Sequence, residues 1–286
     1  MQKLGISPNS QKETGQNIEI VMEDRGFQTL PLIEGKLQKP SQNRLVRLSR
    51  PGHRRIRGPS RMISVIIPAH NEQLYLPLTL EALQRQNYRS AEVIVVTNGC
   101  TDGTAAVAQS RCHQLIVLSQ KNLGVARNLG ARMAKGELLL FLDADTALEP
   151  LALQFIAEQF SRKEAAGTLK GKPDSAVPAY RFIYALKNFS HRTKLHCGSS
   201  GVIICWKEHF LRVGGFDEGL EVRENSELIQ RLTRFGRYKY IGDVTATTSM
   251  RRYQQCGVWP TIWLWIKLWL QSHFGDLHRR HYETVR

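Results

Sequence analysis

The segment that most constrains this chain is an apolar run, LLLFL at residues 138–142, followed at once by Asp143, Ala144 and Asp145. A short continuous apolar run predicts a strand that is covered on both faces, as in a parallel sheet. Ligands of open parallel sheets bind beyond the carboxyl ends of the strands, which is where these two carboxylates stand. Hard oxygen ligands suit Mg2+ or Mn2+, so the segment is a candidate site for a metal ion and a phosphate.

A second interpretation of the same residues needs no ligand. Asp145 or Thr146 can cap a helix that begins near Glu149 and Pro150, because side-chain oxygens accept hydrogen bonds from the first amides of a helix. The Asp-Ala-Asp segment alone leaves both interpretations open.

Strand and helix patterns alternate through the middle of the chain. β-Branched or apolar runs predict strands, helical spacing or a polar capping residue predicts helices between them, and this alternation predicts βαβ units with a parallel sheet. The expected strands are 63–67, which Pro68 should stop, and 92–96, 115–118 and 138–142, and the expected helices begin after Asn71, at 102–104 and at 124. The chain is therefore predicted to be an α/β protein whose loops 68–72, 97–104 and 143–145 share one rim.

These rim loops have the polar groups that a nucleotide needs. Asn98 offers an amide to a base edge, and Asp102 can cap a helix whose N-terminal end favours an anion. Neither a P-loop nor a dinucleotide fingerprint is present. The sequence predicts a nucleotide-like ligand with a metal ion by a different route.

Five motifs follow one another along the chain: VIIPAHNE (65–72), VVTNGCTDGT (95–104), KNLGVARNLGARMAKGE (121–137), FLDADT (141–146) and VGGFDE (213–218). In this order and spacing they resemble the family 2 glycosyltransferases with their single-domain GT-A fold. The resemblance covers residues 62–235, and it implies a mostly parallel twisted sheet flanked by helices, with the catalytic domain at 62–250.

The resemblance also implies a site and a reaction. The donor would be a nucleotide-diphosphate sugar, the cofactor a divalent metal, Mn2+ or Mg2+, and transfer would invert the anomeric centre. Asp145 would be the direct metal ligand, with Asp143 beside it and near the ribose or sugar, and Arg127 would approach the diphosphate. The implied nucleotide-sugar residues are Pro68, Ala69, His70, Glu72, Asn98, Arg127, Asp143 and Ala144.

The sequence departs from the family pattern at the general base. Asn225 stands where the family carries its catalytic Asp, and an amide cannot accept a proton there. Glu224 and Asp217 are the candidates for a relocated base. A phosphate acceptor would need no base because it is already ionised. The remaining alternative is a binding protein that kept the fold but lost turnover.

The two ends of the chain differ from its middle. Residues 1–61 are polar and rich in Arg and Lys, so they are predicted to form a disordered arm, and they lack the apolar region of a secretory signal. The net charge of +15 favours anionic partners, yet no nucleic-acid motif is present. Five scattered cysteines without a CxxC pair indicate reduced thiols and a cytoplasmic protein.

Residues 251–286 are expected to form an apolar helical tail. The Trp-rich stretch 259–270 is shorter than the roughly 20 residues that a membrane span needs. It fits a helix at the inner face of a membrane, or equally one packed on the catalytic domain. Arg251 and Arg252 precede it and are candidate ligands of a lipid phosphate acceptor. The alternative is a saccharide or another acceptor with a hydroxyl group.

Overall fold

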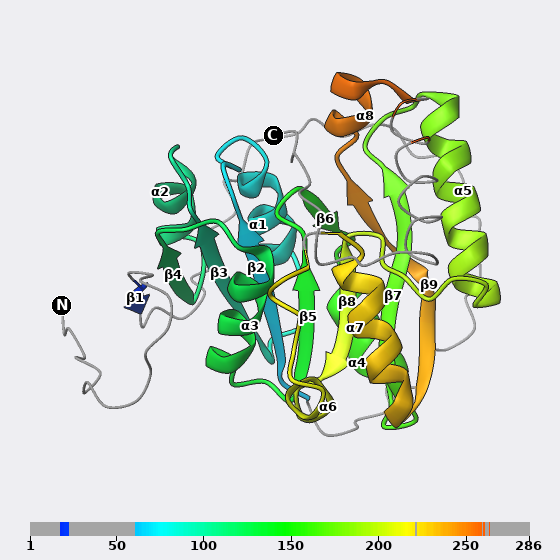
Figure 1. The fold of residues 1–286 in the computed structure, drawn as a ribbon, viewed down its shortest axis with the longest axis horizontal. Coiled ribbons are helices and arrows are strands. Elements are labelled where there is room, and N and C mark those ends of the chain that lie inside the picture. Colours follow the sequence, from blue (N-terminus) through cyan, green and yellow to red (C-terminus); the bar gives the residue numbers. More distant parts are fainter. Residues whose placement is uncertain (1–17, 23–60, 221, 259, 261–262, 264–286) are drawn as a thin grey trace, which may run out of the picture.

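The computed structural model describes residues 18–22, 61–220, 222–258, 260 and 263. They form one nine-stranded sheet with helices on both faces (Figure 1). The strands are β1 Ile18–Met22, β2 Ile63–Ala69, β3 Ala91–Asn98, β4 Gln114–Leu118, β5 Leu138–Leu142, β6 Thr146–Leu148, β7 Glu164–Pro173, β8 Val202–Trp206 and β9 Arg237–Thr248. The helices are α1 Leu76–Gln84, α2 Thr104–Gln109, α3 Leu123–Met133, α4 Ala152–Gln159, α5 Pro178–Thr193, α6 Lys207–Arg212, α7 Glu224–Leu232, the 3-10 turn η1 Thr233–Phe235 and α8 Arg251–Cys256.

The strand order is β1-β4-β3-β2-β5-β8-β7-β9-β6. The predicted α/β class is confirmed, since β4, β3, β2 and β5 are mutually parallel and are joined by helices. Beyond β5 the sheet is mixed, because β8 runs antiparallel to β5 and to β7. The sequence-derived strands at 92–96 and 115–118 are each found slightly lengthened.

Strand β5 lies between two hydrophobic clusters, one on each face of the sheet. Leu138, Leu140 and Leu142 pack in the cluster that contains α1 and α4. Leu139 and Phe141 point the other way, into the cluster with α3, α6 and α7, because successive side chains of a strand alternate between faces. The continuous apolar run therefore has its predicted cause, which is burial on both sides.

Three local expectations were wrong. Strand β2 continues through Pro68 to Ala69, where it pairs with β3 alone because its pairing with β5 ends at Ile66. Asn71 does not cap α1: its φ is +53° and its side-chain oxygen accepts the amide of Thr101 at 2.9 Å. The sequence patterns at 238–241 and 244–248 predict two short strands, but both belong to one strand, β9, whose register against β7 shifts at residues 169–170.

The N-terminal arm is not wholly without structure. Residues 18–22, a β-branched and acidic pentapeptide, form β1 and pair antiparallel with β4. Arg61, which ends the predicted arm, donates to the carbonyls of Ala157 and Phe160 at 3.1 and 2.6 Å, and its guanidinium lies 5.5 Å from the Trp206 ring centroid. The remainder of the arm and most of the Trp-rich stretch lie outside the described residues.

Helix α3 comes close to the sheet at a glycine. A Cβ on Gly130 would meet the Cγ2 atoms of Ile66 and Val96 at 2.5 and 3.2 Å, so a side chain there forces α3 away from β2 and β3. We expect Gly130→Leu to lower the free energy of unfolding by about 2 kcal/mol, the cost of overpacking a core. Arg132→Leu, on the exposed side of the same helix, is the control, and denaturant unfolding of both variants is the measurement. Equal stability of the two would contradict this packing.

Candidate functional site

The turn after β5 is fixed by backbone contacts from three other segments. The Asp143 amide donates to the Gly201 carbonyl at 3.0 Å, and the Ala144 carbonyl accepts the Thr79 hydroxyl at 2.8 Å. The Asp145 carbonyl accepts the Ser249 amide at 3.1 Å. Thr146 starts β6 and pairs with β9 instead of capping α4. The capping interpretation is thus wrong, and both carboxylates remain available to a pocket.

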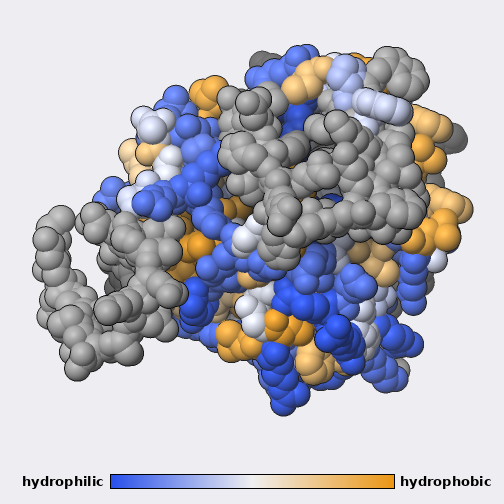
Figure 2. All heavy atoms as spheres, in the orientation of Figure 1, coloured by the Kyte–Doolittle hydropathy of each residue, from blue (hydrophilic) through white to orange (hydrophobic). Residues whose placement is uncertain are grey.

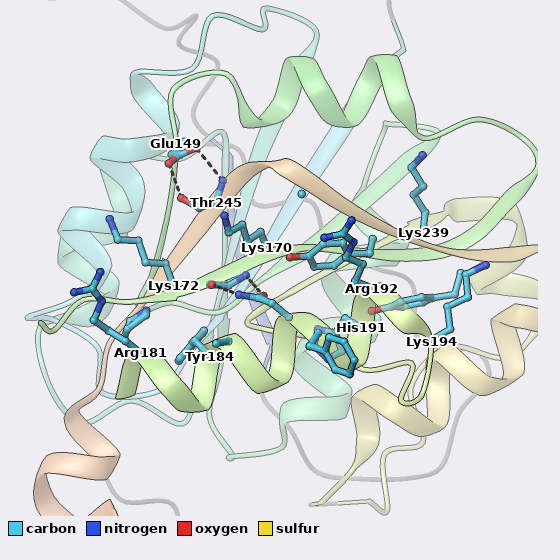
Figure 3. Close-up of a pocket in the computed structure, with 18 of the residues that line it drawn as sticks. Glu149, Lys170, Lys172, Arg181, Tyr184, His191, Arg192, Lys194, Lys239 and Thr245 are labelled. Atoms are coloured by element: carbon cyan, nitrogen blue, oxygen red, sulfur yellow. Dashed lines mark hydrogen bonds between the residues drawn. The ribbon is translucent and has the colours of Figure 1, made fainter. Parts of the chain in front are cut away.

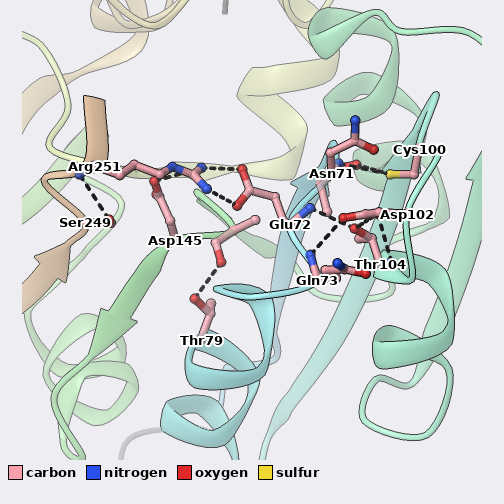
Figure 4. A network of polar contacts seen from close by, with 12 residues as sticks. Asn71, Glu72, Gln73, Thr79, Cys100, Asp102, Thr104, Asp145, Ser249 and Arg251 are labelled. Atoms are coloured by element: carbon pink, nitrogen blue, oxygen red, sulfur yellow. Dashed lines mark hydrogen bonds and ion pairs between the residues drawn. The ribbon is translucent and has the colours of Figure 1, made fainter. Parts of the chain in front are cut away.

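Asp145 belongs to a network of charges with Glu72 and Arg251 (Figure 4). Arg251 makes a two-point ion pair with Glu72 and a further contact of 3.2 Å with Asp145. The side chains of Glu72 and Arg251 are only 3% and 12% exposed. Burial opposes the charge on Arg251, but the pairing with Glu72 and Asp145 raises the pKa of the guanidinium. The predicted metal ligand and a predicted acceptor residue are therefore in direct contact.

Asp143 belongs to a second network, centred on Arg127 of α3. The Arg127 guanidinium contacts Asp143 at 3.2 Å and Glu224 at 3.1 Å, and it donates to the Asn225 side-chain oxygen at 2.9 Å. It also lies 4.8 Å from the centroid of the Phe216 ring. Because the Arg127 side chain is only 4% exposed, its charge is balanced by these neighbours and not by water.

Asn128, one residue further along α3, joins this helix to the loop before α7. Its side chain accepts the Phe216 amide at 2.8 Å and donates to the Phe216 carbonyl at 2.9 Å. Gly215 has a φ of +77°, and a Cβ there would meet the Asn128 oxygen at 2.5 Å, so the loop needs glycine at this point. The motifs at 121–137 and 213–218 therefore dock on each other and bring Glu224 and Asn225 to Arg127.

The two networks share the wall of a pocket of about 280 Å3. Nine of the predicted site residues line it: Pro68, Glu72, Arg127, Asp143, Ala144, Asp145, Glu224, Arg251 and Arg252. Asn225 does not line the pocket itself. Its side chain contacts two residues that do, because it donates to Ser199 at 3.1 Å and accepts from Arg127.

Besides Asn225, four predicted site residues do not line this pocket. Asn98 is buried, and its side-chain oxygen accepts the Asn122 amide at 2.7 Å. The Nδ1 atom of His70 lies 2.7 Å from the Asn98 carbonyl, and Ala69 is fully buried. Asp217 accepts the Gly219 amide within its own loop. Their part in nucleotide binding or catalysis stays a prediction.

Sequence analysis missed the contribution of α5 and of the loop before β8. Tyr184 and Lys187 come from α5, and Ser199, Ser200 and Arg223 from loops. Burial, together with the charge of Arg252, lowers the pKa of Lys187 to about 8. The only sequence signal for α5 is Pro178 at its start followed by inward residues at helical spacing, namely Tyr180, Tyr184 and His191.

The pocket offers a divalent metal two carboxylates from the same turn. No group of three or more His, Cys, Asp or Glu side chains suited to a metal occurs in the described part of the chain. Mg2+ and Mn2+ are commonly held by one or two carboxylates with substrate phosphates and water completing the shell. Asp143 and Asp145 fit that mode of binding, in which the ligand brings part of the coordination.

Comparison with known proteins identifies the class of fold and then the family. The mixed sheet, covered by helices on both faces, is a GT-A fold, which it shares with solved glycosyltransferase structures. The sequence profile of Glycosyl transferase family 2 matches residues 64–252, and the chain belongs to that family.

Individual relatives share less than a third of their residues with this chain. An uncharacterized glycosyltransferase of Haemophilus influenzae is 28% identical over 182 residues, which are 60% of this chain and 62% of the relative. Staphylococcus aureus TarS 1-349 in complex with UDP-GlcNAc superposes with a TM-score of 0.51 at 23% identity, over 65% of this chain and 58% of that one. The mannosyltransferase PcManGT of Pyrobaculum calidifontis, in complex with GDP-Man and Mn2+, superposes with a TM-score of 0.53 at 19% identity, over 65% of this chain and 56% of that one. The chain thus spans less than two thirds of these relatives.

Arg127 should contribute to stability as well as to the site. Replacing it by Met leaves Asp143 and Glu224 without the cation that both contact, and breaking the buried pair with Glu224 costs about 3 kcal/mol. Arg85→Met breaks an exposed i,i+4 pair with Glu81 and should change the free energy of unfolding by less than about 1 kcal/mol. Denaturant titration of both variants is the measurement, and an Arg127→Met protein as stable as the control would contradict the network.

Proposed function

We propose that this protein transfers a sugar from a nucleotide-diphosphate sugar to an acceptor, with a divalent metal and inversion of the anomeric centre. The observation that carries the proposal is the pair Asp143 and Asp145 at the end of β5, both lining one pocket with Arg127. Membership of the family and its fold support it. So do two neighbours of the same fold, whose structures contain UDP-GlcNAc in one and GDP-Man with Mn2+ in the other.

In this proposal each charged residue has a separate task. When bound, the metal stabilises the negative charge that develops on the leaving diphosphate. Asp145 and Asp143 hold it, and Arg127 fixes the orientation of Asp143 through their 3.2 Å contact. Arg251 places a second positive charge beside Asp145, where it would attract the phosphates of the donor. The buried Glu72 holds that guanidinium in position by its two-point contact.

Glu224 is the proposed general base for a hydroxyl acceptor. It lines the pocket and is adjacent to Asn225, whereas Asp217 lies in a loop outside the pocket lining. Glu227, another acid of this segment, makes a two-point pair with Arg231. Asn225 serves as a spacer in this scheme, since its amide joins Arg127 to Ser199.

A phosphate acceptor is the second candidate, and the cations of the pocket favour it. Lys187, Arg223 and Arg252 line the pocket besides the two arginines of the carboxylate networks. An ionised phosphate needs no general base, and cationic side chains bind its oxygens. Arg251 is less suited to bind this acceptor than these three cations, because it is already paired with Glu72 and Asp145.

The metal-binding assignment is tested at Asp145. We expect Asp145→Asn to lower the rate of sugar transfer, or of donor hydrolysis without acceptor, on the order of 10^3-fold, as loss of a group that stabilises developing charge does. Thermal stabilisation by Mn2+ plus a nucleoside diphosphate should disappear together with activity. Asp243→Asn removes an exposed carboxylate that contacts Gln159 and should behave as wild type. Binding of a nucleotide sugar without turnover by the wild-type protein would instead support a catalytically inactive member of the fold.

The acceptor class is tested by Glu224→Gln and Lys187→Met. A hydroxyl acceptor requires the base, so Glu224→Gln should lose about 10^2-fold or more in kcat, whereas Lys187→Met should retain most of it. A phosphate acceptor reverses this pattern. It also predicts that acceptor KM rises as the pH passes about 8, since Lys187, whose pKa is lowered to about 8, is charged below that pH and neutral above it. Steady-state kinetics measured from pH 6 to 9, in steps of about one pH unit, distinguish a hydroxyl acceptor from a phosphate acceptor.

A further inference from the structure

Helix α5 presents an apolar stripe to solvent. Phe182, Leu186 and Phe189 recur at the i, i+4 and i+7 spacing of one helix face, and their exposed fractions are 64%, 53% and 59%. The opposite face of α5 buries Tyr180, Tyr184 and His191. The helix lies at the edge of the molecule in Figure 1, and Figure 2 shows apolar side chains gathered along that edge. This helix therefore has one apolar face inside the protein and a second one outside it.

A basic groove borders the stripe. It occupies about 1370 Å3 between α5 and the strands β7 and β9, and cationic side chains surround it (Figure 3). Its acids are engaged elsewhere: Glu164 pairs with Arg237, Glu149 accepts the amide and hydroxyl of Thr245, and Asp174 accepts the Met250 amide. The cations along it are Lys170, Lys172, Arg181, Arg192, Lys194 and Lys239.

We propose that the α5 stripe and the basic groove together form a docking surface for an anionic phospholipid membrane. Exposed aromatic and aliphatic side chains with cations on their flank are the composition of helices that lie in a bilayer interface. Each Lys or Arg near an anionic leaflet adds to binding, and the apolar stripe inserts at the boundary between headgroups and acyl chains. No helix of the described residues is long and apolar enough to cross a membrane, so attachment through this surface would be peripheral.

Charge decides against a second copy of the chain as the occupant of this surface. A twofold interface places the same patch on both sides, so the six cations of one groove would face or flank the six of its partner. Like charges brought together at an interface are unfavourable. An anionic surface satisfies both parts of the patch, whereas an uncharged protein partner would satisfy only the stripe.

The docking surface is connected to the candidate active site. Tyr184 lines both the basic groove and the site pocket, and α5 and α8 share a cluster that contains Tyr180, Tyr184 and Tyr253. Trp263, beyond α8, is 67% exposed. The docking surface and the site pocket therefore share helix α5, which also supplies the pocket's Lys187. The surface is independent of sugar transfer, because vesicle binding requires neither donor nor turnover.

The test is co-sedimentation of the full chain with phosphatidylcholine vesicles, with and without phosphatidylglycerol. The wild-type protein should bind the anionic vesicles more tightly, and less so at high salt. The variant Phe182→Ser/Leu186→Ser/Phe189→Ser should weaken binding about tenfold or more, and so should Lys170→Gln/Lys172→Gln/Lys194→Gln. The controls are Leu74→Ser/Leu78→Ser, at leucines that are 74% and 60% exposed and belong neither to α5 nor to the groove lining, and Arg89→Gln/Arg111→Gln.

Several results would overturn the proposal. Wild-type binding that ignores phosphatidylglycerol, or variants that bind like the wild type, would show that this surface is not the determinant and that any attachment comes from the ends of the chain. Concentration-dependent dimers in sedimentation velocity, lost in the α5 variant, would assign the stripe to a second copy. Unchanged melting temperature and nucleotide-sugar binding in the variants show that the fold and the candidate active site are intact, so failure here is distinct from failure of the proposed transferase activity.

Discussion

The buried guanidinium of Arg127 is the charge on which the arrangement of this site depends. A cation with a 4% exposed side chain must obtain from the protein the interactions that water would otherwise supply. Asp143 from the end of β5 and Glu224 with Asn225 from the start of α7 provide them. Three segments that are far apart in sequence are therefore fixed relative to one another by the needs of one side chain, and the pocket lies where they meet.

A second buried arginine acts on the other carboxylate of the same turn. Arg251, which follows the last strand, contacts Asp145 and is held by Glu72 from the end of β2. Each acid of the Asp-Ala-Asp segment thus has its own arginine, one from α3 and one from α8. The charge of each of these two carboxylates is balanced in this way, and the proposed donor with a divalent cation would enter the pocket as a nearly neutral unit.

The sequence predicts best the features whose cause is local. The run at 138–142 is buried on both faces because each of its side chains is apolar, and the glycines of the 213–218 motif are needed by a positive φ and a close approach to Asn128. Continuation of β2 through Pro68 was not predictable, since it depends on where the neighbouring strand β5 stops pairing. The contact between Asp145 and Arg251 joins residues that are 106 positions apart in the sequence, and no local pattern encodes such a pairing.

The distribution of charge links the two surfaces that sequence analysis could not separate. The net charge of +15 shows only that anions are favoured as partners, but the structure divides the cations by environment. In the site pocket, arginines are paired with carboxylates and contribute order. In the groove beside α5, lysines and arginines outnumber the acids, and these acids already have partners. A paired cation positions its neighbours, whereas an exposed group of cations that outnumber the nearby acids attracts an extended anionic surface at a distance. In this proposal the basic residues of one chain therefore have two roles, which differ because their burial and pairing differ.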